Sequence, residues 1–386
     1  MNAQRVDQHT LRRRGTGLIA ADPDAASPGY TLFAPLTGTG QVYLVGLDGT
    51  VAHQWDLPYR PGCHARLLPN GNLAYNGVLP GEPALFPGWL TYRGGALCEV
   101  DPSGAIVREH RDELQHHDAY HYGDGRVLYV TVEPLTADAA RAVPGGVPGS
   151  EAGGVVYADV IKEVDASGAV TWSWQAADHL DPALYPLQPH YRREHWPHIN
   201  GVCPLADGSV AASLRSVSSV VIIDRATGGV TWRLGPDTLA QQHCPSELAD
   251  GSLLLFDNGT FRDAENVPYS RVIEVDRRTR AITWEYRDSP RENFFTALMG
   301  AAQRLPNGNT LITESMFGRV FEVDRDGRVC WEYVVPYFSA YHDEQTARLF
   351  PEVTNAVFRA YRYAPGEVPW LTSMRRGTSR RGCADA

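Results

Sequence analysis

The chain has 386 residues, of which 43% are apolar and 21% charged, so neither a disordered nor a collagen-like chain is expected. Glycine and proline together make up about one residue in six, and with nine tryptophans and eighteen tyrosines they favour short strands joined by tight turns. The net charge of −10 disfavours nucleic acid as a partner, because proteins that bind it are normally basic.

Residues 1–29 are predicted to form an N-terminal tail. It contains the arginine run 12–14, but the apolar stretch that follows is too short for an export signal. No window approaches the ~18 apolar residues of a membrane span, so no membrane partner is expected. The six cysteines are scattered and form no Cys-x-x-Cys pair, which is typical of reduced thiols. These features predict a cytoplasmic protein.

From residue 30 onward one pattern recurs six times: an apolar strand, a turn with an aspartate, and a second strand that often ends in tryptophan. Aspartate and glycine accept turn geometry, and β-branched residues alternate on each side of the turn, so each copy predicts a hairpin. The turn aspartates are Asp48, Asp101, Asp165, Asp224, Asp276 and Asp324.

A second kind of hairpin, with Asn-Gly or Asp-Gly at its tip, lies between these copies. It occurs at residues 67–75, 122–130, 204–213, 247–256 and 304–313. Two hairpins per period make a four-stranded unit of roughly 50 residues, the size of a propeller blade. The sequence therefore predicts an all-β fold, a six-bladed β-propeller of four-stranded antiparallel blades over residues 30–365, followed by a C-terminal tail over 366–386.

The missing sixth copy of the second hairpin marks the point where the ring closes. Residues 30–34 and 356–363 are predicted to supply it by pairing with each other, which would join the two ends of the propeller and cover its sheet edges. Longer insertions rich in glycine and proline, at residues 78–96, 133–156 and 176–195, are predicted to cover one mouth of the ring.

Four histidines occur at a repeated place, just before the second hairpin of a blade: His64, His117, His198 and His243. If each precedes the innermost strand of its blade, the four side chains converge on the central channel. Convergence of residues from distant parts of the chain points to a site more strongly than any single histidine does.

The sequence resembles the arylsulfotransferase family over roughly residues 40–365. The most specific matches are Gln115-His-His-Asp118, Trp196-Pro-His-Ile-Asn-Gly201 and residues 215–224, with further matches at Trp232-Arg-Leu-Gly235, Gln242-His243, residues 255–259 and residues 357–363. The resemblance implies a six-bladed propeller. It also implies an enzyme that moves a sulfuryl group between phenols through a sulfohistidine, without a nucleotide donor or another cofactor.

Carried over to this chain, the resemblance makes His243 the covalent nucleophile, with His117, His198 and Arg215 holding the sulfate. A neutral imidazole is a competent nucleophile, and a guanidinium presents a planar fork of donors to sulfuryl oxygens. We expect His64, His121, Asn200 and Asn258 to contact a small aromatic or anionic substrate. The mouth aromatics Trp89, Tyr92, Tyr120 and Tyr191 could stack on its ring. Cys244 stands where the family commonly has an acidic residue, and Leu214 where a serine is usual.

Two other functions use the same architecture. The imidazoles of His64, His117, His198 and His243 could instead bind a transition metal such as Cu, Mn, Fe or Zn, which would make the protein a metal-dependent lyase, hydrolase or oxidoreductase. A propeller can also serve as a non-catalytic scaffold that binds a peptide on its top face. The clustering of histidine, arginine and asparagine in the channel favours an enzyme over the scaffold.

Overall fold

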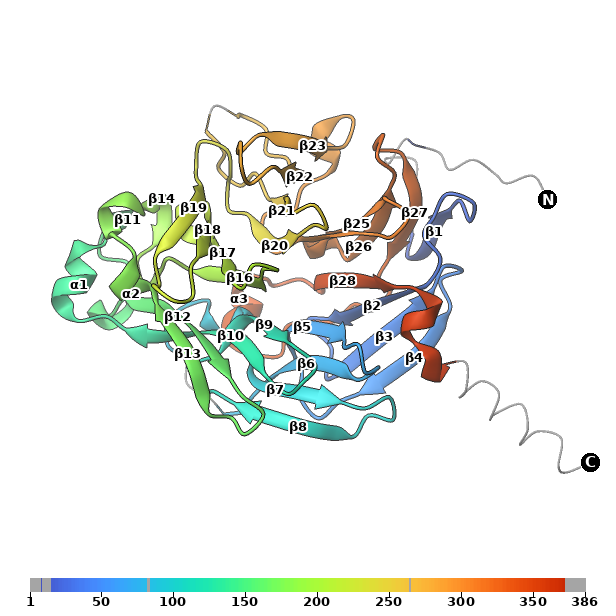
Figure 1. The fold of residues 1–386 in the computed structure, drawn as a ribbon, viewed down its shortest axis with the longest axis horizontal. Helices are drawn as coiled ribbons and strands as arrows, with labels where there is room; N and C mark the ends of the chain where they lie inside the picture. Colours follow the sequence, from blue (N-terminus) through green and yellow to red (C-terminus); the bar gives the residue numbers. More distant parts are fainter. Residues whose placement is uncertain (1–7, 9–14, 82–83, 264, 372–386) are drawn as a thin grey trace, which may run out of the picture.

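Six antiparallel sheets surround a common centre in the computed structural model, which describes residue 8 and residues 15–81, 84–263 and 265–371 (Figure 1). Each sheet contains four antiparallel strands in order from the centre outward, so the predicted all-β, six-bladed propeller is confirmed. Within the described residues, no helix is long and apolar enough to cross a membrane.

Every blade begins with an inner strand beside the channel and ends with an outer strand at the rim. In that order, the first blade contains β28 (Val357–Tyr363), β2 (Tyr30–Pro35), β3 (Gln41–Gly46) and β4 (Val51–Asp56). The second contains β5 (Pro61–Leu67), β6 (Leu73–Val78), β7 (Gly95–Val100) and β8 (Ile106–Arg111). The third contains β9 (His116–His121), β10 (Val127–Pro134), β12 (Tyr157–Val164) and β13 (Val170–Gln175), with β15 (His195–Trp196) paired to β12.

The remaining blades follow the same order. The fourth contains β16 (Ile199–Pro204), β17 (Val210–Leu214), β18 (Ser219–Ile223) and β19 (Val230–Leu234). The fifth contains β20 (His243–Glu247), β21 (Leu253–Asp257), β22 (Arg271–Val275) and β23 (Ile282–Tyr286). The sixth contains β24 (Ala301–Arg304), β25 (Thr310–Glu314), β26 (Arg319–Val323) and β27 (Val329–Val334), and β1 (Gly17–Ala21) adds a fifth strand at its outer edge.

The ring closes as the sequence predicted, because β28 from the end of the chain pairs antiparallel with β2 from its beginning, with Tyr30 opposite Tyr363. The structure extends the propeller beyond residues 30–365 at both ends. β1, which lies in the predicted N-terminal tail, pairs with β27, and Val368 and Leu371 in the predicted C-terminal tail are buried against the first two blades. The other residues of the two predicted tails largely lie outside the described residues.

The repeated aspartate turn and tryptophan form one contact between neighbouring blades. The indole N–H of the tryptophan on an outermost strand donates a hydrogen bond to a backbone carbonyl in or beside the aspartate turn of the next blade, and Trp331 in the sixth blade reaches Leu47 in the first at 2.9 Å. Four other tryptophans make the equivalent bond: Trp55 to Asp101, Trp172 to Arg225, Trp232 to Arg277 and Trp284 to Arg325. In the second blade Arg108 takes this role and donates to Ala166 at 3.0 Å. Hydrogen bonds of this kind contribute about 1 kcal/mol each, so the pattern links all six blades.

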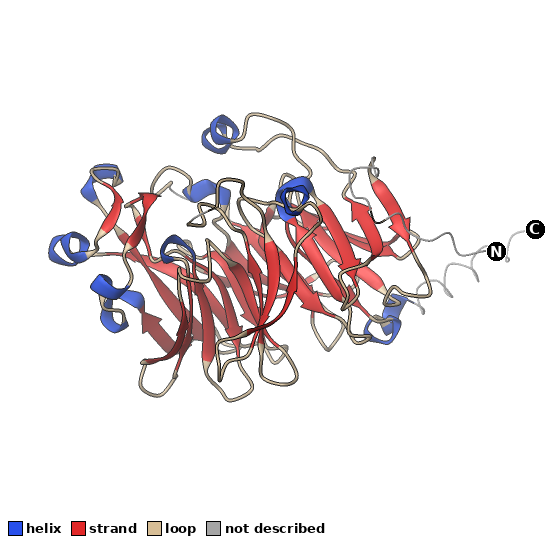
Figure 2. Ribbon diagram, turned by 90° about the horizontal axis from the view of Figure 1, so that it is seen from above, coloured by secondary structure: helices blue, strands red, loops and turns tan. Residues whose placement is uncertain are grey.

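The short helices, five of which belong to the three insertions, lie mostly along one side of the sheets, whereas tight hairpin turns close the other side (Figure 2). The α-helices are α1 (Ala137–Ala142), α2 (Ala176–His179) and α3 (Glu344–Leu349). The 3-10 helices are η2 (Trp89–Thr91), η3 (Ala152–Gly154), η4 (Pro182–Leu184), η5 (Arg215–Val217), η6 (Arg291–Asn293), η7 (Ser315–Phe317) and η8 (Pro365–Glu367).

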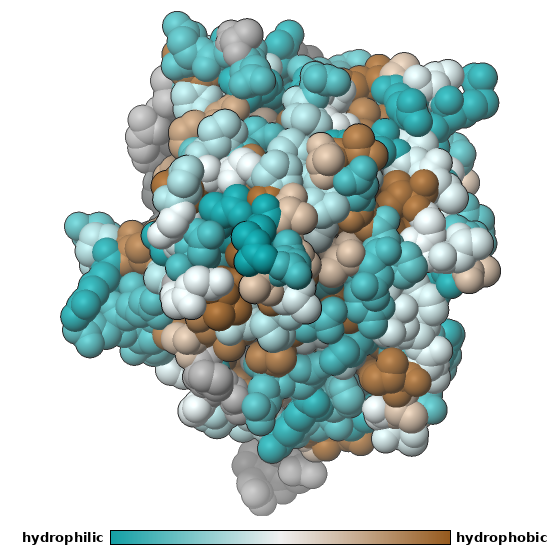
Figure 3. Space-filling view, turned by 90° about the vertical axis from the view of Figure 1, so that its left-hand side faces the viewer, coloured by the Kyte–Doolittle hydropathy of each residue, from teal (hydrophilic) through white to brown (hydrophobic). Residues whose placement is uncertain are grey.

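Two of the predicted insertions join each other. β11 (Gly145–Val147), from the second insertion, pairs parallel with β14 (Leu187–Arg192), from the third. On the face of the molecule that carries them, hydrophobic residues appear in small separate groups among polar ones (Figure 3). The first and third insertions reach the mouth of the channel, and the second supports the third from outside.

Candidate functional site

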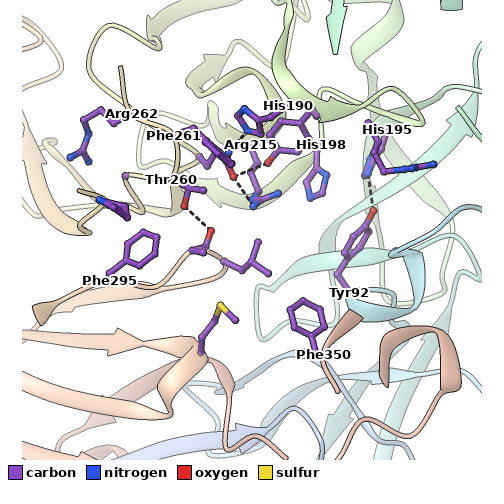
Figure 4. Close-up of a pocket in the computed structure, with 18 of the residues that line it drawn as sticks. Tyr92, His190, His195, His198, Arg215, Thr260, Phe261, Arg262, Phe295 and Phe350 are labelled. Carbon is purple, nitrogen blue, oxygen red and sulfur yellow. Dashed lines mark hydrogen bonds between the residues drawn. The ribbon is translucent and has the colours of Figure 1, made fainter. Parts of the chain in front are cut away.

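A cavity of about 800 Å³ opens at the mouth where the inner strands begin (Figure 4). Its floor includes His198 and Arg215, and its walls carry aromatic side chains. The walls come from the first and third insertions and from loops around residues 259–268, 295–298 and 350, which no sequence pattern had marked. The aromatic residues of the lining are Phe86, Tyr92, Tyr191, Phe261, Phe295 and Phe350.

The inner strands share an unusual backbone conformation below this cavity. In five blades one non-glycine residue at the start of the inner strand has a left-handed backbone, with φ between 49° and 79°: Cys63, His117, His198, Cys244 and Met299. In the second to fifth blades, the register between the inner strand and the next strand shifts at or beside this residue. Such bulges re-aim side chains and are common beside active sites. His117 and His198 occupy this position, whereas His64 follows it by one residue and His243 precedes it by one.

His117 and His198 contact each other, with their Nε2 atoms 3.3 Å apart. The ring of Tyr92 stacks on His117 at a centroid distance of 4.1 Å and lies 5.1 Å from His198. Burial, followed by the charges of neighbouring histidines, holds the pKa of both imidazoles well below the usual value. Both rings are therefore neutral at physiological pH, so one nitrogen of each can donate and the other can accept.

Arg215 begins η5, and its backbone N–H donates to the carbonyl of His198 at 2.9 Å. Its Nη2 donates to Oε1 of Gln241 at 2.7 Å, and that oxygen also accepts from the Tyr191 hydroxyl at 3.1 Å. The buried Nε of Arg215 has no acceptor among the residues that the structure describes. The charge of Arg215 lowers the pKa of His117, His198 and His243 alike, although burial contributes more to each shift. The guanidinium is thus close to all three histidines and has donor capacity left for an anion.

His243 begins β20 and lies behind the cavity lining, where it is 2% exposed. Its Nδ1 lies 2.7 Å from Oδ1 of Asn258, and its Nε2 accepts a hydrogen bond from the backbone N–H of Met299 at 3.2 Å. Burial lowers the pKa of His243 to about 3, with Arg215 the next cause. The imidazole is therefore neutral, with its proton on Nδ1 and its lone pair on Nε2. The Phe358 ring lies 6.3 Å from His243 and 6.5 Å from His117, and so is beside both imidazoles.

The other predicted substrate residues are dispersed. Asn200 lies beside the strand that His243 begins, where its Nδ2 donates to the carbonyl of Gln242 at 2.9 Å. His121 ends β9, at the opposite end of that strand from His117, where burial and Arg66 lower its pKa to about 3. His64 lies in β5, and its side chain falls outside the described part of the structure.

Of the four aromatic candidates, Tyr92 and Tyr191 line the cavity. Trp89 is fully buried behind Tyr92, and Tyr120 packs under the guanidinium of Arg66 instead.

A second group of titratable residues, which sequence reasoning missed, adjoins the site. His116 and His195 both place Nε2 near Oδ1 of Asp159, at 3.0 and 2.8 Å. His116 also joins the first group, since its Nδ1 lies 2.7 Å from Nδ1 of His117. His116 lies in the motif Gln115-His-His-Asp118, and His195 directly precedes the motif that begins at Trp196. Asp159 lies in the middle of a strand, where no sequence motif marks it.

A buried ion pair lies deeper in the channel. Arg359 on β28 reaches Asp118 on β9 at 3.2 Å, and Oδ2 of Asp118 accepts from the backbone N–H of Val202. The contact links the first, third and fourth blades beneath the histidines.

The family model for arylsulfotransferase (ASST) matches residues 95–335, more than half of the chain. The chain belongs to this family. Membership in the arylsulfotransferase family supports a transferase with an arylsulfotransferase-like function. No curated protein matches the chain significantly.

Solved structures resemble this arylsulfotransferase-family chain in fold. A protein of unknown function from Bacteroides caccae has a TM-score of 0.52 at 12% identity, covering 80% of this chain and 94% of its own. The streptogramin B lyase structure has a TM-score of 0.43 at 11% identity, covering 81% and 85%. The Cps50 (Swd1) β-propeller domain of Myceliophteria thermophila has a TM-score of 0.43 at 12% identity, covering 85% and 91%.

Proposed function

We propose that this protein transfers a sulfuryl group from one phenolic compound to another, with His243 as the covalent carrier. The observation that carries the proposal is the state of His243, a neutral imidazole whose Nδ1 proton is held by Asn258 and whose Nε2 keeps its lone pair. Family membership and the nearby guanidinium of Arg215 support it. The proposal needs no dissociable cofactor.

In the first half-reaction the Nε2 lone pair of His243 attacks the sulfur of the donor. The S–N bond forms as the S–O bond to the aromatic ring breaks, and the bonding pair leaves on the phenolate oxygen. Met299 donates to Nε2 and residues 297 and 298 line the cavity, so attack requires this segment to move away from Nε2. In the second half-reaction an acceptor phenol attacks the sulfur, and the pair of the S–N bond returns to Nε2.

The leaving phenolate departs as the anion and is protonated by solvent after release. The acceptor phenol must lose its proton as it attacks, and a neutral imidazole can take this proton and pass it to solvent, so the protein ends unchanged. His198 lines the cavity and contacts His117, which suits this pair to the role of base. Arg215 offers donors to the sulfuryl oxygens, whose charge shifts toward the leaving group as the bond breaks.

The substrate that fits the cavity is a small aromatic anion. Its walls carry six phenylalanine and tyrosine rings, and three of its five charged lining residues are arginines: Arg192, Arg215 and Arg262 beside Glu194 and Glu265. We further propose a cytoplasmic location, which the five free cysteines among the described residues support.

The test is a colour assay with 4-nitrophenyl sulfate as donor and phenol as acceptor. The wild type should release 4-nitrophenolate, and His243→Ala should release none. Without acceptor, the wild-type peptide that contains His243 should gain the mass of one SO₃ group. His342→Ala, which changes an exposed histidine outside the cavity lining, serves as the control. Full activity in His243→Ala would overturn the proposal.

A further inference from the structure

A second site in the third blade is built from residues that the proposed sulfuryl transfer does not use. Nε2 of His116, Nε2 of His195 and a carboxylate oxygen of Asp159 lie within 4.8 Å of one another, and all three residues are buried. They come from β9, β15 and β12, so three separated segments of the chain converge on one point.

The charge balance of this group is incomplete. The Asp159 side chain is fully buried, and its contacts are the two imidazoles and the backbone N–H of Ile199 at 2.8 Å. Within the described ranges, neither an arginine nor a lysine forms an ion pair with it. A buried carboxylate needs a positive partner, which is either a proton shared with an imidazole or a metal ion.

The geometry of His116 favours the metal ion. Its Nε2 lies 3.0 Å from Oδ1 of Asp159, but off the line that a hydrogen bond needs, and it has no hydrogen-bond partner in the described part of the chain. His195 already occupies the same oxygen at 2.8 Å. A cation between the three atoms would give Nε2 of His116 a partner. The same cation would neutralise the negative charge of Asp159.

The outer hydrogen bonds are those of a metal site. The second nitrogen of His116 bonds to His117 at 2.7 Å, the second nitrogen of His195 bonds to the Tyr92 hydroxyl at 3.3 Å, and the second oxygen of Asp159 accepts from Ile199. Each ligand is thus oriented through the atom that would not bind the metal, as is usual around metal centres.

We infer that His116, Asp159 and His195 bind one divalent first-row transition metal ion, such as zinc or ferrous iron. Two imidazoles and one carboxylate are ligands that these ions accept, and they leave at least one position for water or a substrate oxygen. This site differs from the one that the sequence suggested, which used His64, His117, His198 and His243. His195 lines the cavity, so the ion would adjoin the substrate.

The experiment uses the full chain, stripped with a chelator and titrated with Co²⁺ as a spectroscopic substitute. We expect one equivalent to bind, to give visible d–d bands and to appear in elemental analysis. Asp159→Asn keeps the shape of the side chain and an acceptor for Ile199, and should abolish binding. Tyr92→Phe removes only an outer hydrogen bond and should weaken binding by about tenfold or more. His190→Gln, at a cavity histidine outside the group, should bind normally.

Two results would overturn the inference: no Co²⁺ or Zn²⁺ bound by the stripped wild type, or undiminished binding by Asp159→Asn. If Asp159→Asn fails to fold, His195→Gln and Tyr92→Phe decide in its place. Metal content is measured without any substrate, so this result is independent of the sulfuryl-transfer assay. Failure of either proposal leaves the other standing.

Discussion

Asn258 determines which nitrogen of His243 carries the proton. The Nδ2 of Asn258 donates to the carbonyls of Thr296 and Met299 at 2.8 and 2.6 Å, so its Oδ1 must face Nδ1 of His243 as an acceptor. Nδ1 therefore holds the proton, and Nε2 keeps the lone pair that sulfuryl transfer needs. In the proposed reaction this amide would prepare the nucleophile, and Asn258 itself lies outside the cavity lining.

Asn258→Ala should lower kcat/KM with 4-nitrophenyl sulfate by at least about tenfold, because the proton of His243 is then free to move to Nε2. The ¹⁵N shifts of His243 should report the mixed tautomers in the alanine variant. Asn266→Ala, at an exposed position in the cavity wall, is the control. Unchanged ¹⁵N shifts in Asn258→Ala would contradict this role.

Arg215→Lys should reduce kcat by about 100-fold, because a point charge cannot present two donors to the sulfuryl oxygens. The lysine would also lose the contact with Gln241 that holds the guanidinium in place. The measurement is steady-state kinetics with a sulfate donor. Arg233→Lys is the matched control, since Arg233 is held by Ser219 and Leu184 outside the cavity. Near-normal turnover of Arg215→Lys would count against the assignment.

Phe261 should contribute to binding the phenolic ring. It lines the cavity, is 67% exposed and lies 3.9 Å from the ring of His190. Phe261→Asn suits the left-handed backbone at this residue, where φ is 57°, and removes the aromatic surface. We expect the KM for phenol to rise by about two- to tenfold with kcat unchanged. Phe317→Asn, at an exposed phenylalanine outside the cavity lining, should leave KM unaltered; an equal rise there would contradict a specific role.

Stability should fall as the pH drops below about 6.5. His121 and His243 have a folded pKa of about 3, far below the unfolded value of ~6.5, so only the unfolded chain gains protons between these values. Each residue then costs about 1.4 kcal/mol of unfolding free energy per pH unit in that range. Urea unfolding at pH 7.5 and 5.5 measures the loss. His121→Gln, far from the proposed nucleophile, should remove the part of this pH-dependent loss that His121 contributes. An unchanged pH dependence in this variant would contradict the role of His121.

The architecture was predictable because the repeated residues make the contacts between blades. At each aspartate turn, a tryptophan or arginine of the preceding blade donates a hydrogen bond to a backbone carbonyl. The residues that repeat in the sequence therefore form the same contact between each pair of neighbouring blades. The pairing of β28 with β2 followed from the hairpin that was missing from the count. Turn chemistry and the number of copies together fixed the number of blades.

The site was only partly predictable, since side-chain direction changes with every residue along a strand. His64, His117, His198 and His243 looked equivalent, but the left-handed bulge residue is His117 or His198 in two blades and Cys63 or Cys244 in two others. His64 and His243 are therefore each displaced by one residue. Asp159 could not be found from the sequence, because a carboxylate in mid-strand becomes informative only when two distant histidines meet it.

The strand that closes the ring, β28, is the last strand of the propeller to be synthesised. β28 supplies Arg359 and Phe358 to the channel, and it ends at Tyr363, after every other strand of the ring. During synthesis the second to sixth blades are complete before β28 is made, while the first blade still lacks its inner strand. The first blade therefore gains its inner strand only after β28 has been made, and a chain cut short before residue 357 would leave the ring open at β2.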